Sequence, residues 1–117
     1  KELKIISDQC GNPTYGLDLA VGVLRCIDHP RFFDNSTYHL AQEPATNWYR
    51  FAKKILELSR IKTSLIPIKS STKAIAKRPN YSVINTQYIK KTLSLNLRSW
   101  ESALEECINK IQTNESV

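Results

Sequence analysis

The chain of 117 residues is 41% hydrophobic and 24% charged and carries a formal net charge of +6, which is typical of one soluble globular domain with a basic surface. No apolar run approaches the roughly 20 residues that cross a membrane, and the first residues lack the apolar core of a signal peptide. The positive charges are spread along the chain and are not gathered among aromatic residues, so we expect no nucleic-acid partner and favour a small anionic ligand.

The sequence contains no methionine, and we expect it to begin inside a longer protein. Its three cysteines, Cys10, Cys26 and Cys107, lack the spacing of metal ligands. An odd number of cysteines, two of them on apolar helix stripes, indicates reduced thiols. We therefore expect a cytoplasmic protein without a metal site.

The first third of the chain predicts a strand, a polar loop and a helix. Leu3–Ser7 is a short apolar run, and residues 8–14 form a loop rich in turn-forming residues. Thr14 is the predicted N-cap of a helix over Tyr15–Asp28, whose apolar residues fall on two faces and predict burial on both sides. Asp18 interrupts this apolar surface, and we interpret it as favourable complementarity to the helix dipole.

The middle of the chain predicts two strands around a second helix. Thr37–Ala41 has the pattern of a short strand, and Thr46 is the predicted cap of a helix that extends to about Arg60. Trp48 lies on the apolar face of that helix and is interpreted as a core residue, with stacking on a ligand as the alternative. Leu65–Ile68 is a strand candidate, confined to a sheet edge by its proline.

The segment Ala76–Tyr88 presents two adjacent cations, Lys77 and Arg78, directly before Pro79. Proline fixes its own φ and stiffens the backbone where the charge is presented. Such an arrangement suits an anion such as a phosphate, and a surface ion pair of Arg78 is the structural alternative.

Two further helices close the sequence. Asn85 is the predicted cap of a short helix over Thr86–Thr92, and Ser99 is the predicted cap of the last helix, which buries a stripe from Ala103 to Ile111. Taken together, the pattern predicts an α/β segment of about four helices packed on a few short strands.

The sequence shows little sign of a catalytic centre. It contains no Gly-x-Gly-x-x-Gly loop, no zinc-spaced set of Cys and His, and no Gly-x-Ser-x-Gly elbow. His29 and His39 stand apart from one another and are interpreted as structural. The residues alone therefore indicate a binding or interface domain, with no catalytic, cofactor-binding or metal-ligating residues in this chain.

Four stretches, in the same order and spacing, resemble the signatures of dTDP-4-dehydrorhamnose reductases, which are extended short-chain dehydrogenases/reductases. The family patterns are D-Q-x-G-x-P-T with D-L-A, Y-H-L-A with W-Y-x-F-A, R-P-x-x-S with a following D/N, and W-x-x-A-L. The matching residues are 8–14 with 18–20, 38–41 with 48–52, 77–79 with Ser82 and Asn85, and 100–104. The resemblance extends over nearly the whole chain.

This resemblance implies that residues 1–117 are the C-terminal nucleotide-sugar-binding domain of a Rossmann-type reductase. Such an enzyme reduces dTDP-4-dehydro-L-rhamnose to dTDP-L-rhamnose with NADPH (or NADH), for cell-surface polysaccharide. The family's N-terminal Rossmann domain binds the cofactor and carries the catalytic Tyr-x-x-x-Lys pair. Because that domain is absent from this sequence, we expect this chain alone to bind no cofactor and to be inactive, with its own N-terminal domain as a partner and a homodimer as a further possibility.

The resemblance also implies a set of substrate-binding residues. Arg78 is expected to contact the pyrophosphate with support from Lys77, because a guanidinium can pair two phosphate oxygens at once. The other expected substrate-binding residues are Asp8, Gln9, Pro13, Thr14 and Ser82. Turn and cap chemistry remains the alternative for Asp8, Thr14 and Ser82, as it does for Asn85.

The chain departs from the family pattern at two positions, with Ser94 where glycine is usual and Arg98 where proline often precedes the final helix. Both bear on local turn geometry and lie away from the inferred cleft. Two alternatives remain open: a segment of a non-catalytic relative, such as the regulatory subunit of methionine adenosyltransferase, and a free-standing basic anion-binding module.

Overall fold

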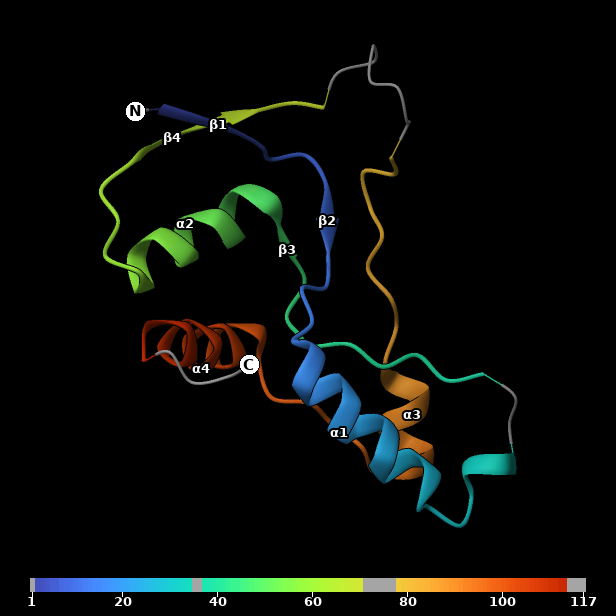
Figure 1. Ribbon diagram of the computed structural model, residues 1–117. Helices are drawn as coiled ribbons and strands as arrows, with labels where there is room; N and C mark the ends of the chain where they lie inside the picture. The colour runs from blue at the N-terminus through green and yellow to red at the C-terminus, as the bar shows by residue number, and fades with distance from the viewer. Residues whose placement is uncertain (1, 35–36, 71–77, 114–117) are drawn as a thin grey trace.

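The computed structural model describes residues 2–34, 37–70 and 78–113 (Figure 1). The helices are α1 (Gly16–Ile27), α2 (Trp48–Leu58), α3 (Gln87–Leu93) and α4 (Trp100–Gln112), with a 3-10 turn at Phe32–Asp34. The strands are β1 (Glu2–Ile6), β2 (Cys10–Gly11), β3 (Thr46–Asn47) and β4 (Ser64–Ile68). The predicted α/β segment of about four helices and a few short strands is confirmed. No helix in the described ranges has the length and apolar character that crossing a membrane requires.

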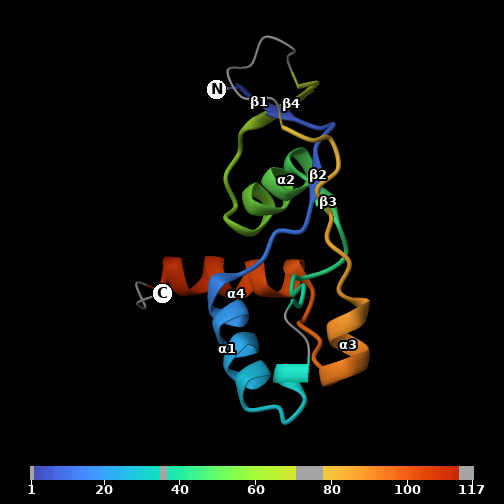
Figure 2. The same ribbon diagram turned by 90° about the vertical axis from the view of Figure 1, so that its right-hand side faces the viewer.

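The strands form two small sheets that lie on one side of the helices α1 and α3. β1 pairs in parallel with β4, with Glu2 opposite Ser64 and Ile6 opposite Ile68. β2 pairs antiparallel with β3 through Cys10 and Asn47. In both views the β1–β4 sheet and α2 lie at one end of the molecule, α1 and α3 lie at the other, and α4 runs between them (Figure 2).

The core is divided between these two ends. At the α1 and α3 end, the buried cluster consists of Cys26, Ile89, Leu93 and Leu95, and Phe32, Tyr38 and Leu40 pack against it. At the other end, Phe51 of α2 meets Trp100 of α4 edge to face, with ring centroids 5.6 Å apart. The loop between β2 and α1 joins the two ends, and this loop forms part of the cavity described below.

Helix α1 packs closely on one side and is open on the other. A Cβ atom at Gly22 would lie 2.7 Å from the Cδ2 atom of Leu40, so glycine is what permits the close approach of this helix. The rest of the helix surface exposes large apolar residues, namely Leu17, Leu19, Val21, Val23, Leu24 and Ile27. Burial on both sides, which the sequence predicts, is therefore found within this chain on one side only.

The prediction of a strand at Thr37–Ala41 is wrong. These residues form no strand; the side chains of Tyr38 and Leu40 pack against the core cluster and Ala41 is buried. A strand requires an aligned neighbouring backbone, whereas this segment is held by its side chains. Alternation of polar and apolar residues does not distinguish these two cases.

Several predicted helix boundaries are shifted by one or two residues. Asn47, not Thr46, caps α2 by accepting a hydrogen bond from Arg50 N at 2.8 Å. Tyr15 occupies the N-cap position of α1 in place of Thr14. Thr86 occupies that of α3, but the Asn85 side chain still accepts a hydrogen bond from Gln87 N at 2.9 Å at the start of this helix. The predicted cap of the last helix is confirmed, because the Ser99 side chain accepts from Ser102 N at 3.2 Å. Hydroxyl and amide residues adjoin each of these helix starts, so composition alone cannot select the capping residue.

Ser94 ends α3 in the left-handed region, with φ 52° and ψ 28°. A Cβ atom strains this conformation by about 1–2 kcal/mol, and glycine relieves the strain but adds about 0.4–1 kcal/mol of unfolded-state entropy, so Ser94→Gly is expected to stabilise the protein by about 1 kcal/mol or less. Urea unfolding of the two proteins checks this value. Ser94→Ala, which retains the Cβ, is the control; an equal gain from alanine would contradict the explanation.

Candidate functional site

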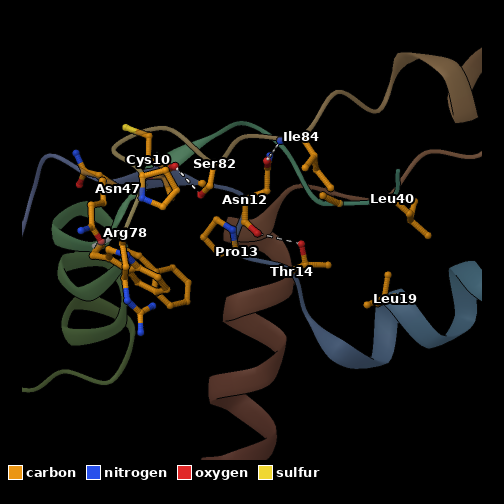
Figure 3. Close-up of a pocket in the computed structure, with 17 residues that line it drawn as sticks. Cys10, Asn12, Pro13, Thr14, Leu19, Leu40, Asn47, Arg78, Ser82 and Ile84 are labelled. Atoms are coloured by element: carbon orange, nitrogen blue, oxygen red, sulfur yellow. Dashed lines mark hydrogen bonds between the residues drawn. The ribbon is translucent and has the colours of Figure 1, made fainter. Parts of the chain in front are cut away.

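A cavity of about 430 Å³ lies where the β2–α1 loop, the start of α2 and the segment after residue 77 meet (Figure 3). Its walls come from residues within 9–14, 40–51 and 78–84, together with Leu19 of α1. Three segments that lie far apart in the sequence thus enclose one space. Its size is within the range of small-molecule binding sites.

One wall is made by β2 with the loop after it and by the segment 80–84, which run side by side. Cys10 N donates to Asn80 O at 2.8 Å, and Ser82 N donates to Cys10 O at 2.9 Å. Ser82 Oγ also donates to Cys10 O at 3.1 Å. Further along, Ile84 N donates to Asn12 Oδ1 at 3.0 Å. These bonds fix the two segments as one surface.

Gln42 holds the loop that follows β2. This residue is 1% exposed, and its Oε1 accepts a hydrogen bond from Tyr15 N at 2.8 Å. Its backbone N donates to Thr14 Oγ1 at 3.3 Å, and its backbone O accepts from Asn12 Nδ2 at 2.9 Å. A single buried residue therefore satisfies polar groups of three loop residues.

Beside Gln42, the carboxylate of Asp18 accepts from two side chains. Gln42 Nε2 donates to Asp18 Oδ2 at 2.7 Å, and Arg98 donates to both carboxylate oxygens at 2.7 and 2.9 Å. Arg98 also pairs with Glu106 of α4. The two carboxylates, Asp18 first, raise the pKa of the Arg98 guanidinium, and Arg98 followed by Lys110 lowers the pKa of Glu106. The interpretation of Asp18 as a helix-dipole residue missed this network.

Aromatic side chains form another part of the wall. Trp48 and Phe51 both line the cavity, with ring centroids 6.4 Å apart at 73°. The prediction that Trp48 is a core residue is wrong, because 52% of it is exposed. Trp48 is the first residue of α2, directly after its cap, and this position beside the loops is the signal that periodicity alone overlooks.

Arg78 lines the same cavity and is exposed (Figure 3). Among the described residues, none of the ion pairs involves Arg78. The alternative of a surface ion pair therefore finds no partner in that part of the chain. An exposed guanidinium beside aromatic rings suits a ligand with both an anionic and a planar group.

The structure brings together five of the seven predicted substrate-binding residues. Those that line the cavity are Gln9, Pro13, Thr14, Arg78 and Ser82. Asp8 lies elsewhere: its carboxylate accepts from Ser70 N at 2.9 and 3.1 Å and from Ser70 Oγ at 2.9 Å, and the backbone N–H of Ser70 lowers the pKa of Asp8. Lys77 lies outside the described residues. The role of each residue toward a substrate stays a prediction.

Glu43 is expected to make stability depend on acidic pH. Its carboxylate accepts from Lys90 Nζ at 2.7 Å and from Thr86 Oγ1, and these bonds, Lys90 first, hold its pKa below the ordinary value of 4.5. A lowered pKa in the folded state contributes stability above pH 4.5 that is lost as the pH falls through the folded pKa. Urea unfolding of the unmodified protein and Glu43→Gln should therefore give a stability difference that shrinks from pH 7 to pH 3. A difference that does not change with pH would contradict this assignment.

Comparisons of this chain with known proteins agree on one family. The profile of the RmlD substrate binding domain matches residues 1–113. The spore coat polysaccharide biosynthesis protein SpsK of Bacillus subtilis (strain 168) is 34% identical over 107 residues, which are 91% of this chain and 36% of that protein.

Two solved structures are also similar to this chain. The dTDP-4-dehydrorhamnose reductase of Clostridium acetobutylicum superposes with a TM-score of 0.86 at 35% identity, over 95% of this chain and 39% of that one. The dTDP-4-dehydrorhamnose reductase of Bacillus anthracis, solved in complex with NADP, gives a TM-score of 0.80 at 32% identity, over 91% of this chain and 37% of that one. The chain thus spans well under half the length of the proteins that it matches.

Proposed function

This chain belongs to the family of RmlD substrate-binding domains, and we propose that it is the C-terminal nucleotide-sugar-binding domain of a dTDP-4-dehydrorhamnose reductase. The whole protein would reduce dTDP-4-dehydro-L-rhamnose to dTDP-L-rhamnose for polysaccharide biosynthesis in the cytoplasm. The observation that carries the proposal is the cavity in which Arg78, the loop 9–14 and two aromatic rings meet. The alternatives of a regulatory relative and a free-standing basic module are not favoured, because the reported relatives with a named activity are reductases.

The lining residues suit the parts of a nucleotide-sugar. The guanidinium of Arg78 can donate two parallel hydrogen bonds to pyrophosphate oxygens. The rings of Trp48 and Phe51 offer flat apolar faces to a base or a sugar ring. Ser82 Oγ, which already donates to Cys10 O, keeps lone pairs for a sugar hydroxyl.

The reduction also needs a hydride donor, which NADPH (or NADH) supplies when it is bound. The residues of this chain do not fit a dinucleotide. The three glycines, Gly11, Gly16 and Gly22, are too far apart in the sequence to form the Gly-x-Gly-x-x-Gly loop that holds a dinucleotide phosphate. The described residues contain no group of three His, Cys, Asp or Glu that could hold a metal ion. We therefore assign cofactor and catalytic residues to an N-terminal Rossmann domain, and propose that this chain alone is inactive.

The exposed apolar residues on α1 favour a partner for this domain. Six large apolar residues on one helix exceed what scattered surface residues explain. The reported relatives extend well beyond the length that this chain matches. We propose that the N-terminal domain of the longer protein covers this face, and that a homodimer is a further possible assembly.

Calorimetric titration of dTDP into the complete protein tests the proposed function. We expect saturable binding and a change in tryptophan fluorescence that is smaller in Trp48→Phe, because Trp48 lines the cavity. Thymidine, which lacks the pyrophosphate, should bind more weakly. Absence of dTDP binding would overturn the proposal, and binding without reduction of dTDP-4-dehydro-L-rhamnose would favour the regulatory relative.

A further inference from the structure

We propose that Arg98 is a positioning residue for the cavity, acting through Asp18 and Gln42 on the loop Asn12–Tyr15. The proposal rests on the proposed function for the identity of the ligand, but the contacts are independent of that identity. Arg98 itself does not line the cavity. Its effect on a ligand would therefore pass through other side chains.

The first step of the connection is the pair between Arg98 and Asp18. Arg98 Nε and a terminal nitrogen each donate to a different oxygen of the Asp18 carboxylate, at 2.7 and 2.9 Å. This two-point contact fixes the plane of the carboxylate as well as its position. The Asp18 side chain is only 18% exposed, so water competes little for its oxygens.

The second step passes from Asp18 to the loop through the amide of Gln42. Because Tyr15 N can only donate, the atom of Gln42 that accepts from it is Oε1, and Nε2 must face Asp18. The orientation of the amide is thus determined by its two partners. If Asp18 rotated or lost its acceptor, Gln42 Nε2 would be left buried without a partner, which is costly in a residue 1% exposed.

The third step connects Gln42 to the cavity wall. The backbone of Gln42 bonds Thr14 Oγ1 and Asn12 Nδ2, and Asn12 Oδ1 in turn accepts from Ile84 N. Asn12, Thr14 and Ile84 all line the cavity. The network therefore runs from the start of α4 to two walls of the cavity, and its loss should loosen both.

Glu106 provides a matched control within the same network. Arg98 pairs with Glu106 as well as with Asp18, and Glu106 also pairs with Lys110 at 2.9 Å, but these contacts lead away from Gln42. Asp18→Asn and Glu106→Gln each remove one carboxylate beside Arg98 while keeping the side-chain shape. In Asp18→Asn the amide oxygen can take the place of Oδ2 and still accept from Gln42 Nε2, but the NH2 group then faces the Arg98 nitrogen that donates to Oδ1. The two-point contact that fixes the plane of the Asp18 side chain is therefore lost in this variant and kept in Glu106→Gln.

The test compares these two variants and Arg98→Lys in the complete protein, by dTDP titration and by hydrogen exchange at the amides of Tyr15 and Ile84. We expect Asp18→Asn and Arg98→Lys to weaken dTDP binding by roughly 3- to 10-fold and to speed exchange at Tyr15. Glu106→Gln should change the dTDP affinity and the exchange rate at Tyr15 by less than about 2-fold.

The outcomes separate this proposal from the proposed function. If all three variants bind dTDP and exchange at Tyr15 as the unmodified protein does, the positioning role is overturned. A loss of dTDP affinity in Glu106→Gln as large as that in Asp18→Asn would overturn it as well. If the unmodified protein does not bind dTDP, the proposed function fails, whereas exchange at Tyr15 still decides whether Arg98 positions the loop. If Asp18→Asn does not fold, Arg98→Lys decides the question by the same two measurements.

Discussion

Replacing Arg78 by alanine is expected to weaken dTDP binding by roughly 10- to 150-fold, the equivalent of about 1.5–3 kcal/mol for a hydrogen bond to a charged group. Arg78 lines the cavity, and no ion pair among the described residues occupies its guanidinium. Its removal would thus take away ligand contacts without breaking an ion pair in that part of the protein. Calorimetric titration of the complete protein measures the change.

Two comparisons make this prediction specific to the pyrophosphate. Arg78→Lys keeps the charge but loses the two-point geometry, so its affinity should lie between those of the unmodified protein and Arg78→Ala. Thymidine lacks the phosphates and should bind the unmodified protein and Arg78→Ala equally. Unchanged dTDP affinity in Arg78→Ala would remove Arg78 from the site.

Replacing Ile89 by alanine is expected to lower the free energy of unfolding by about 2–5 kcal/mol. Ile89 is 1% exposed and lies in the cluster with Cys26, Leu93 and Leu95. Removal of its outer carbons loses their burial and leaves a cavity that the surrounding helices fill only in part. A domain is typically stable by about 5–15 kcal/mol, so this loss is large, and urea unfolding measures it.

Position within the core, and not residue type, should set the size of this effect. Ile89→Val removes one carbon and is expected to cost about 0.5–1.5 kcal/mol. Ile111→Ala makes the same chemical change on α4, at a residue that is 56% exposed, and should cost less than about 1 kcal/mol. Similar losses at Ile89 and Ile111 would contradict the placement of the core.

Local sequence patterns predicted the helices well and the irregular segments poorly. α1, α2 and α4 follow from apolar residues at helical spacing, which is a signal contained within each helix. The segment 37–41 has the alternation of a strand but is held by side-chain packing on a cluster that extends to Leu95, 57 positions from Tyr38. No local pattern contains that information.

The residues of the candidate site could be predicted where they belong to a sequence motif. The loop 9–14 and Arg78 were found through their resemblance to a family, and the structure places them around one cavity. Gln42 and Arg98 were missed because their roles depend on partners 24 to 80 residues away, which sequence spacing does not reveal. Trp48 was assigned to the core because an aromatic residue at helical spacing is buried more often than not.

The same long separations have a consequence for how the site comes into being. Ser82 and Cys10 are 72 residues apart in the chain, and Asp18 and Arg98 are 80 residues apart. Closing loops of this length costs chain entropy before any contact offsets it, which slows folding. The cavity can therefore exist only after the segments 9–14, 40–51 and 78–84 have come together. A ligand that contacts several walls would act as a reversible cross-link between these distant segments. It would raise the free energy of unfolding by about 2.7 kcal/mol at a concentration 100 times its dissociation constant.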